Sequence, residues 1–190
     1  MGEPIENLAI GKIIEVDGSR IIAELDADLT ELSRVYGGEV YPVGQFGSVV
    51  QVHFGRRLIY AFVGRLRMKA DYEVERGMSP SPSSDERIIE ADLFGEGEWI
   101  RSHDGPGSKL EFERGVSTYP LPQQTLYLTP KSDLRIIYGH ADGTSILIGE
   151  HVGSGRAPCY AHLNELLGKH TAILGSTGAG KSAAVAAMLH

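Results

Sequence analysis

Short apolar runs separated by glycine-containing turns dominate the first 150 residues of the chain. Residues 11–16 and 20–25 are rich in β-branched side chains and flank Asp17-Gly18, the preferred pair for a tight hairpin turn. Many short strands of this kind, with no convincing long helix, predict a closed or nearly closed β-barrel. The other runs that we expect to form strands are residues 47–54, 58–66, 87–92, 109–112, 125–128 and 145–149.

Irregular segments interrupt this pattern of strands. Residues 28–32 are compatible with one helical turn, residues 134–138 with a strand or one helical turn, and residues 95–107 with turns. Serines and prolines at residues 79–84 leave no apolar side chain to bury. This composition predicts an exposed, flexible loop over about residues 69–86, inside the barrel domain because strands resume directly after it.

The pattern changes near residue 150. Leucines at helix-like spacing in residues 160–167 indicate one or two helical turns. Residues 170–174 then form a short apolar run that suits a buried parallel strand. We therefore predict a barrel domain at residues 1–150, and the beginning of a second domain at residues 151–190.

Composition excludes several classes of protein. Hydrophobic residues make up 42% of the chain and charged residues 23%, which is ordinary for a globular protein. The net charge of −7 makes the chain a poor candidate for binding nucleic acid through its overall field. A single cysteine, Cys159, rules out an intrachain disulfide and fits a reducing cytoplasm, and we expect it to be a small buried hydrophobe rather than a reactive thiol. We expect no signal peptide and no membrane span.

One motif with specific chemistry lies near the end of the sequence. Residues 175–182 read Gly-Ser-Thr-Gly-Ala-Gly-Lys-Ser, which fits the phosphate-binding pattern G-x-x-x-x-G-K-[ST]. The apolar run at residues 170–174 precedes it, and residues 183–190 are rich in alanine and suit a helix. The order strand, glycine loop, helix favours a nucleotide site over a glycine turn that binds nothing.

The proposed mechanism of this loop depends on its backbone. Gly175, Gly178 and Gly180 allow positive φ angles and a close approach to a ligand. The amides of residues 177–182 can then form a concave anion site, and a helix that starts near Lys181 adds its positive dipole end.

The motif gives a complete set of candidate ligands for ATP and Mg²⁺. Lys181 is the candidate catalytic residue, because its ammonium would lie on the β- and γ-phosphates, and the Ser182 hydroxyl would ligate Mg²⁺. The candidate ATP-binding residues are Gly175, Ser176, Thr177, Gly178, Ala179, Gly180, Lys181 and Ser182.

Other polar residues have competing interpretations. Asp92, Glu96 and Glu98 form either a catalytic carboxylate pair or solvated acids in a loop, and we favour the loop. No histidine lies at a zinc-type spacing from a second ligand. The remaining candidates are the arginines Arg56, Arg57, Arg65 and Arg67, which suit solvated strand edges or contacts to a neighbouring subunit, and the aromatics Trp99 and Tyr119, which suit core or interface anchors.

Four stretches together resemble the HerA family of P-loop ATPases, which belongs with the FtsK-type DNA translocases. They are residues 90–98, 114–122, 146–149 and 166–182, and the last is the most specific because it combines two leucines, Gly-Lys-His and the phosphate loop. The resemblance implies a mainly β fold. A small N-terminal barrel, shared with F-type ATP synthase subunits, would precede the start of a RecA-like α/β P-loop ATPase domain.

The resemblance also implies an activity and partners. Members of the family are hexameric rings, here a homohexamer, that use ATP and Mg²⁺ to translocate duplex DNA through a central pore. The barrel would help to hold the hexamer and would dock a partner, either a NurA-like nuclease or a sirtuin-like NADase. This translocase or helicase would act in the cytoplasm in DNA end processing and repair or in antiviral defence, without a membrane partner.

The chain also departs from the family pattern. The Walker B carboxylates, catalytic glutamate, sensor residue and arginine finger of the family lie downstream of the phosphate loop, and none is in this sequence. We therefore expect the N-terminal part of a longer protein that does not hydrolyse ATP by itself. Two alternatives stay open: an oligomerisation and docking barrel without ATPase activity, or an unrelated P-loop protein such as a kinase or a transporter ATPase.

Overall fold

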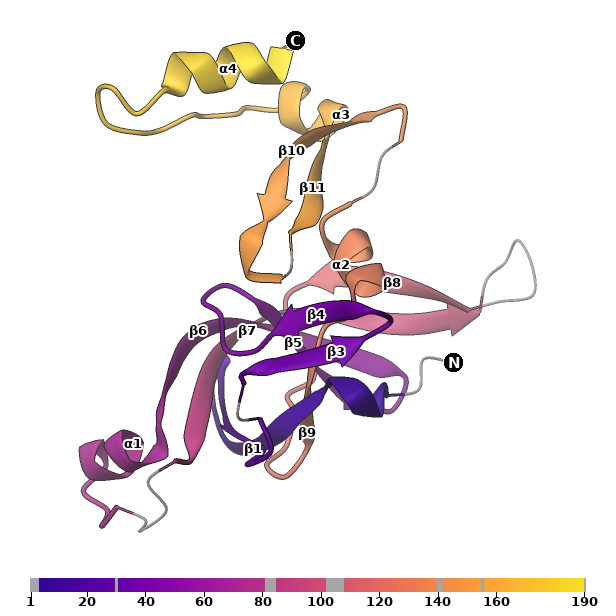
Figure 1. The fold of residues 1–190 in the computed structure, drawn as a ribbon. Coiled ribbons are helices and arrows are strands. Elements are labelled where there is room, and N and C mark those ends of the chain that lie inside the picture. The colour runs from indigo at the N-terminus through magenta and orange to yellow at the C-terminus, as the bar shows by residue number, and fades with distance from the viewer. Residues whose placement is uncertain are drawn as a thin grey trace.

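Antiparallel strands make up most of the computed structural model, which describes residues 4–29, 31–80, 85–101, 108–139, 142–154 and 156–189 (Figure 1). The strands are β1 (Ala9–Asp17), β2 (Arg20–Leu25), β3 (Ser33–Tyr36), β4 (Glu39–Pro42), β5 (Val49–Phe54), β6 (Arg57–Met68), β7 (Arg87–Arg101), β8 (Ser108–Arg114), β9 (Thr125–Leu128), β10 (Ser145–His151) and β11 (Ala157–His162). The helices are α1 (Lys69–Glu75), α2 (Lys131–Ile137), α3 (Leu163–Leu167) and α4 (Lys181–Leu189), with short 3₁₀ turns η1 (Glu6–Leu8) and η2 (Val152–Ser154).

Six strands close into a barrel in the order β1-β2-β7-β6-β5-β9, and every pairing is antiparallel. Closure depends on two pairings between segments far apart in sequence, β2 with β7 and β9 with β1. The predicted mainly β fold with an N-terminal barrel is therefore confirmed. A closed barrel leaves no free edge among its own strands.

β7 both closes the barrel and extends beyond it. Its first half pairs with β2, its second half pairs with β8, and β6 runs alongside it for most of its length. The prediction of turns at residues 95–101 is therefore wrong, and residues 102–107 lie outside the described part. Gly95 and Gly97 belong to the strand, since both pair with residues of β8. The strand needs a glycine at position 97, because a Cβ there would lie 2.9 Å from Leu110 Cδ1 and 3.0 Å from the Tyr60 ring.

Apolar side chains from the inner face of the barrel form the main core. They come from each of its six strands and from the segments that close its ends, and the fully buried ones include Ile10, Ile13, Ile21, Val50, Ile59, Ile89 and Leu126. Alternation along each strand places these residues inside and their neighbours outside. The outer faces of β2, β5, β6 and β7 also carry buried residues, such as Ile22, Val49, Tyr60 and Ile88, so alternation alone does not decide which face of these strands is buried.

Two helices cover apolar patches on the outside of the barrel. α1 buries Tyr72 against Ile22 and Ile88, and α2 buries Leu134 in a second cluster with Tyr60. The loop expected over about residues 69–86 therefore begins with a helix, while residues 81–84 lie outside the described part. Of the two alternatives for residues 134–138, the helix is correct.

Two local predictions in the first hairpin and the segment after it need correction. The two-residue loop of the hairpin is Gly18-Ser19, because Asp17 pairs with Arg20, and Gly18 has a φ of 58°. In residues 28–32, the described positions form turns and no helix, and Leu32 has a φ of 48°. A left-handed residue ends a helical turn, which explains why the pattern failed there.

β10 and β11 form a separate hairpin beyond the barrel (Figure 1). β11 occupies the first part of residues 160–167, so that only α3 is helical there. α2 connects this hairpin to the barrel, since the Tyr160 amide donates to the Tyr138 carbonyl at 2.8 Å and the Tyr138 ring stacks on His151. The boundary expected near residue 150 stays a prediction.

Candidate functional site: a glycine loop at the start of α4

The predicted phosphate loop leads directly into α4, which begins at Lys181 as expected. Gly178 and Gly180 have φ angles of 83° and 78°, so the chain needs glycine at both positions. Gly175 does not have a positive φ, which corrects that part of the prediction. A Cβ at Gly175 would lie 3.3 Å from Ala179 Cβ, so its role is to let the loop fold back on itself.

Lys181 points back over the loop that precedes it. Its Nζ donates to the carbonyl of Gly175 at 2.9 Å and to that of Ser176 at 2.7 Å. The Ala179 amide donates to the Ser176 carbonyl at 3.2 Å and closes a turn inside the loop. The ammonium therefore lies within the curve of the loop, near the place where an anion would lie.

The first turn of α4 presents its polar groups to solvent. The Ala184 amide donates to the Gly180 carbonyl at 2.9 Å, which starts the helical ladder and leaves the preceding amides without helical partners. The Ser182 side chain is exposed. Amide N–H groups, an ammonium and a hydroxyl are donors and ligands that fit a phosphate with Mg²⁺, so the donor set of this loop fits the predicted ligand.

The strand expected at residues 170–174 is not formed. These residues have no regular secondary structure, and 89% of the Leu174 side chain is exposed. A parallel strand is stable only when neighbouring strands take its hydrogen bonds and helices cover its faces. No other segment of the described chain pairs with residues 170–174, which explains the failure of the local pattern.

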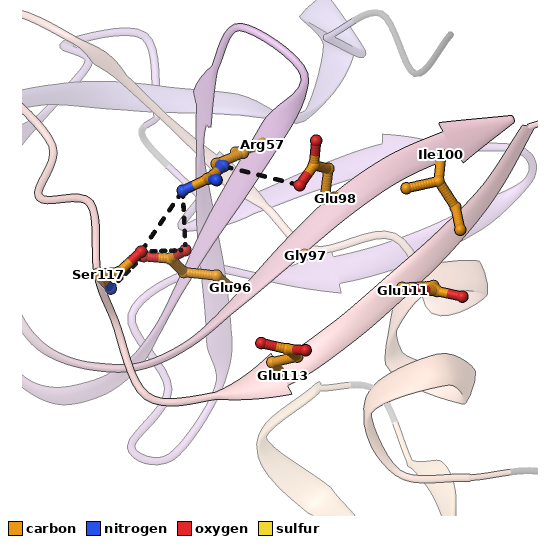
Figure 2. A pocket seen from close by; sticks show the side chains of 8 residues that line it. All are labelled: Arg57, Glu96, Gly97, Glu98, Ile100, Glu111, Glu113 and Ser117. Atoms are coloured by element: carbon orange, nitrogen blue, oxygen red, sulfur yellow. Dashed lines mark hydrogen bonds and ion pairs between the residues drawn. The ribbon is translucent and has the colours of Figure 1, made fainter.

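The three carboxylates that raised the alternative of a catalytic pair lie on β7 and contact neighbouring groups, and Figure 2 shows two of them, Glu96 and Glu98. Glu96 accepts hydrogen bonds from the amides of Ser117 and Thr118 and from the Ser117 hydroxyl, and Arg57 lies 3.6 Å from it. Burial by itself would raise the pKa of Glu96, but these hydrogen bonds and the charge of Arg57 hold it below its usual value. Glu96 therefore has a structural role.

Asp92, Glu98 and Arg67 also have charged partners. Arg20 Nε donates to Asp92 at 3.0 Å, and Glu98 lies 3.8 Å from Arg57. Arg67 pairs with Glu90 at 2.8 Å. The three acids lie on a strand rather than in a loop, but the interpretation that they are not catalytic agrees with these contacts.

The pKa shifts of Cys159, His53 and His151 all favour the uncharged side chain. Burial raises the pKa of Cys159, which keeps the half-buried thiol protonated, as expected for a structural residue. Burial also lowers the pKa of His53 and of His151, which keeps both rings neutral. Within the described ranges, no group of three or more His, Cys, Asp or Glu side chains could hold a metal ion.

The structure also brings together a pair of residues that the sequence did not indicate. Asp133, in the first turn of α2, is 5% exposed, and its Oδ2 accepts a hydrogen bond from Tyr60 at 3.4 Å. The two residues are 73 positions apart, so no local pattern links them. An acidic residue at the start of a helix is common at the surface, and only the tertiary structure buries this one.

A glycine-rich loop that ends in Gly-Lys-Ser at the start of a helix is typical of P-loop nucleotide-binding proteins. Residues 146–190 match the family model described as Helicase HerA, central domain. The resemblance to the HerA-type P-loop ATPases is thereby confirmed for this part of the chain. No curated protein matches the chain. Within the described residues, no helix is both long and apolar enough to cross a membrane.

Proposed function

We propose that the chain is the barrel and phosphate-loop part of an ATP-driven, HerA-type translocase of duplex DNA. The observation that carries the proposal is the position of Lys181, whose Nζ lies over the carbonyls of Gly175 and Ser176. This loop lies inside the segment that matches the HerA central domain. The match also makes an unrelated P-loop kinase or transporter the weaker alternative.

The residues of the loop have distinct roles in this proposal. The backbone amides of residues 177–182 bind the phosphates, and Lys181 leaves its two carbonyl partners to neutralise the β- and γ-phosphate oxygens. Ser182 would supply a hydroxyl ligand to Mg²⁺, which would provide positive charge beside the phosphates. Phosphoryl transfer to water also needs a group that orients or activates the water, and the motif residues 175–182 do not supply one.

The test is Lys181→Ala in the whole protein. We expect ATP turnover to fall by about 100-fold or more, because one charge-stabilising group is lost, while subunit assembly is unchanged. Lys169→Ala is the matched control, since Lys169 is exposed and pairs with Glu165 on α3. Unchanged ATP turnover in Lys181→Ala, measured with and without duplex DNA, would contradict the assignment of residues 175–182 as the ATP site.

The barrel supports a second part of the proposal, which is assembly and docking. Its core is complete without the phosphate loop, because the main cluster includes no residue beyond Leu128. We propose that the barrel helps to hold a homohexamer and docks a NurA-like nuclease or a sirtuin-like NADase, in repair or in antiviral defence. Size-exclusion chromatography of the chain with each candidate tests this role, and tight ATP binding without co-elution would count against it.

A further inference from the structure

A loop between β8 and β9, residues 116–124, presents apolar side chains to solvent. Tyr119 is 50% exposed and Leu121 is 58% exposed. Pro120 between them is buried, and Val116 packs against the barrel core. Large side chains at the surface of a firmly anchored loop are typical of protein interfaces rather than of a solvated turn.

The first half of the 116–124 loop is held by contacts with β6 and β7. Glu96 accepts hydrogen bonds from the Ser117 and Thr118 amides and from the Ser117 hydroxyl, as described above. Arg57 Nη1 donates to the Thr118 hydroxyl at 3.0 Å. These contacts fix the backbone directly before Tyr119.

The second half of the loop is held by Gln123 and Gln124. The Leu121 amide donates to Gln124 Oε1 at 2.6 Å, and the Gln123 amide donates to the Ile13 carbonyl at 2.7 Å. Gln123 has a φ of 73°, an unfavourable backbone angle for a residue with a side chain. Both ends of the loop are thus anchored, and its shape is set before any partner arrives, which lowers the entropy cost of binding.

An acidic surface adjoins the start of the loop. Glu96 lies opposite Glu113, and Glu98 opposite Glu111, across β7 and β8. Like charges directly opposite each other destabilise a sheet, and nearby cations offset only part of this repulsion. Arg57 lies 3.6 Å from Glu96 and 3.8 Å from Glu98, and Lys109 lies 3.8 Å from Glu111. Figure 2 shows these glutamates around a hollow of about 180 Å³ that Ser117 also lines. Arg57 is the one cation among the described residues that line it.

We propose that the 116–124 loop and the glutamates beside it form a docking surface for a segment of a partner protein. Apolar side chains of the partner would pack on Tyr119 and Leu121, and its lysines or arginines would face Glu98, Glu111 and Glu113. The acidic surface selects a basic partner segment and repels DNA. The inference deepens the docking role proposed for the barrel, on which it rests. Binding of the partner segment would not require ATP.

The experiment uses a random peptide library displayed on phage and selected against the chain. We expect the enriched peptides to combine apolar residues with lysine or arginine, and to bind more weakly as salt rises. Tyr119→Ala and Leu121→Ser should each weaken binding about tenfold or more, as anchor residues do. Leu167→Ser is the matched control, since Leu167 on α3 is also 58% exposed and should not affect binding.

Two further variants test the charges and the anchoring of the loop. Glu111→Gln combined with Glu113→Gln should remove most of the salt dependence of binding. Glu96→Gln should weaken binding and also speed hydrogen exchange of the Ser117 and Thr118 amides, because it removes the charge that holds them. Glu96 is thus a positioning residue. Faster exchange confined to these amides, with unchanged exchange in β5 and β6, separates that role from a loss of overall stability.

Several outcomes would overturn the inference. No enriched peptide, peptides without basic residues, or peptides whose binding ignores Tyr119 and Leu121 would each contradict it. Self-association of the chain that Tyr119→Ala abolishes would make the surface an interface between copies. A divalent cation that raises the melting temperature only when Glu111 and Glu113 are present would make the hollow a cation site. Lys181→Ala should leave peptide binding intact, so a failure of the docking proposal can be distinguished from a failure of the ATPase proposal.

Discussion

At the scale of single residues, Gly11 shows how closely the barrel strands approach each other. It pairs with Leu25 on β2 and with Leu126 on β9. A Cβ at Gly11 would lie 2.0 Å from the Glu24 carbonyl oxygen, and backbone cannot move aside as a flexible side chain can. At Gly143, by contrast, a Cβ would meet nothing within 4 Å. Two glycines that look alike in the sequence thus have opposite tolerance to substitution.

Gly11→Ala should lower the free energy of unfolding by about 1–3 kcal/mol, because overpacking forces the backbone of β1 and β2 apart. Gly143→Ala should stay within about 0.5 kcal/mol of the wild-type protein. Urea denaturation followed by circular dichroism measures both. Equal stability of the two variants would contradict the close approach at Gly11.

At the scale of elements, α2 is one of the contacts between the barrel and the β10–β11 hairpin, beside Ala157, which packs in the same cluster as Tyr60. Leu134 is fully buried in the cluster that also holds Tyr60, and the Tyr138 carbonyl at the end of α2 accepts the Tyr160 amide. Asp133 is buried at the start of this helix. Burial raises its pKa, and the hydrogen bonds from Ser132 and Tyr60 offset only part of this effect. At the same pH, Asp133 is therefore protonated more often in the folded protein than in the unfolded chain.

This raised pKa predicts a specific dependence on pH. The stabilising contribution of Asp133 is complete below its ordinary pKa of 3.8 and is lost as pH rises through the raised pKa of the folded state. Asp133→Asn, which stays neutral, should therefore gain stability relative to the wild-type protein between about pH 4 and pH 7.

Urea denaturation across this pH range is the measurement for Asp133→Asn. Asp71→Asn is a suitable control, because Asp71 occupies the same position in the first turn of α1 but is exposed. A stability difference between Asp133→Asn and the wild-type protein that does not vary with pH would refute the link between burial and charge.

At the scale of the whole molecule, the closed barrel and the phosphate loop differ in how they are held. Each barrel strand has two hydrogen-bonded neighbours and an apolar inner face. Residues 170–180 are almost entirely exposed and pair with no strand in the described part of the chain. Local stability is therefore higher in the barrel than in the loop, and a bound ligand would increase local stability most in the loop.

Hydrogen exchange should report this difference directly. Amides in β5 and β6 should exchange slowest, and amides of residues 170–180 fastest. Adding ATP with Mg²⁺ should slow exchange roughly tenfold or more in residues 175–184 and leave the barrel unchanged. The same experiment on Lys181→Ala should show no slowing. Slowing at residues 175–184 that persists in this variant would contradict a role of Lys181 in nucleotide binding.

The sequence by itself was sufficient for features that depend on neighbouring residues. Runs rich in β-branched and other strand-forming residues predicted the first hairpin and β9, and many short strands predicted the barrel. The loop motif placed the start of α4 at Lys181. The role of each motif residue as a ligand of ATP or Mg²⁺ stays a prediction.

The tertiary structure decided everything that depends on contacts between distant segments. The pairing of β2 with β7 closed the barrel, and packing of β8 on β7 turned Gly95 and Gly97 into strand residues. Residues 170–174 have a strand-like pattern but no partner in the described chain to accept their hydrogen bonds. Local pattern determines what a segment can become, but a strand forms only where another strand lies beside it, and that is a property of the whole fold.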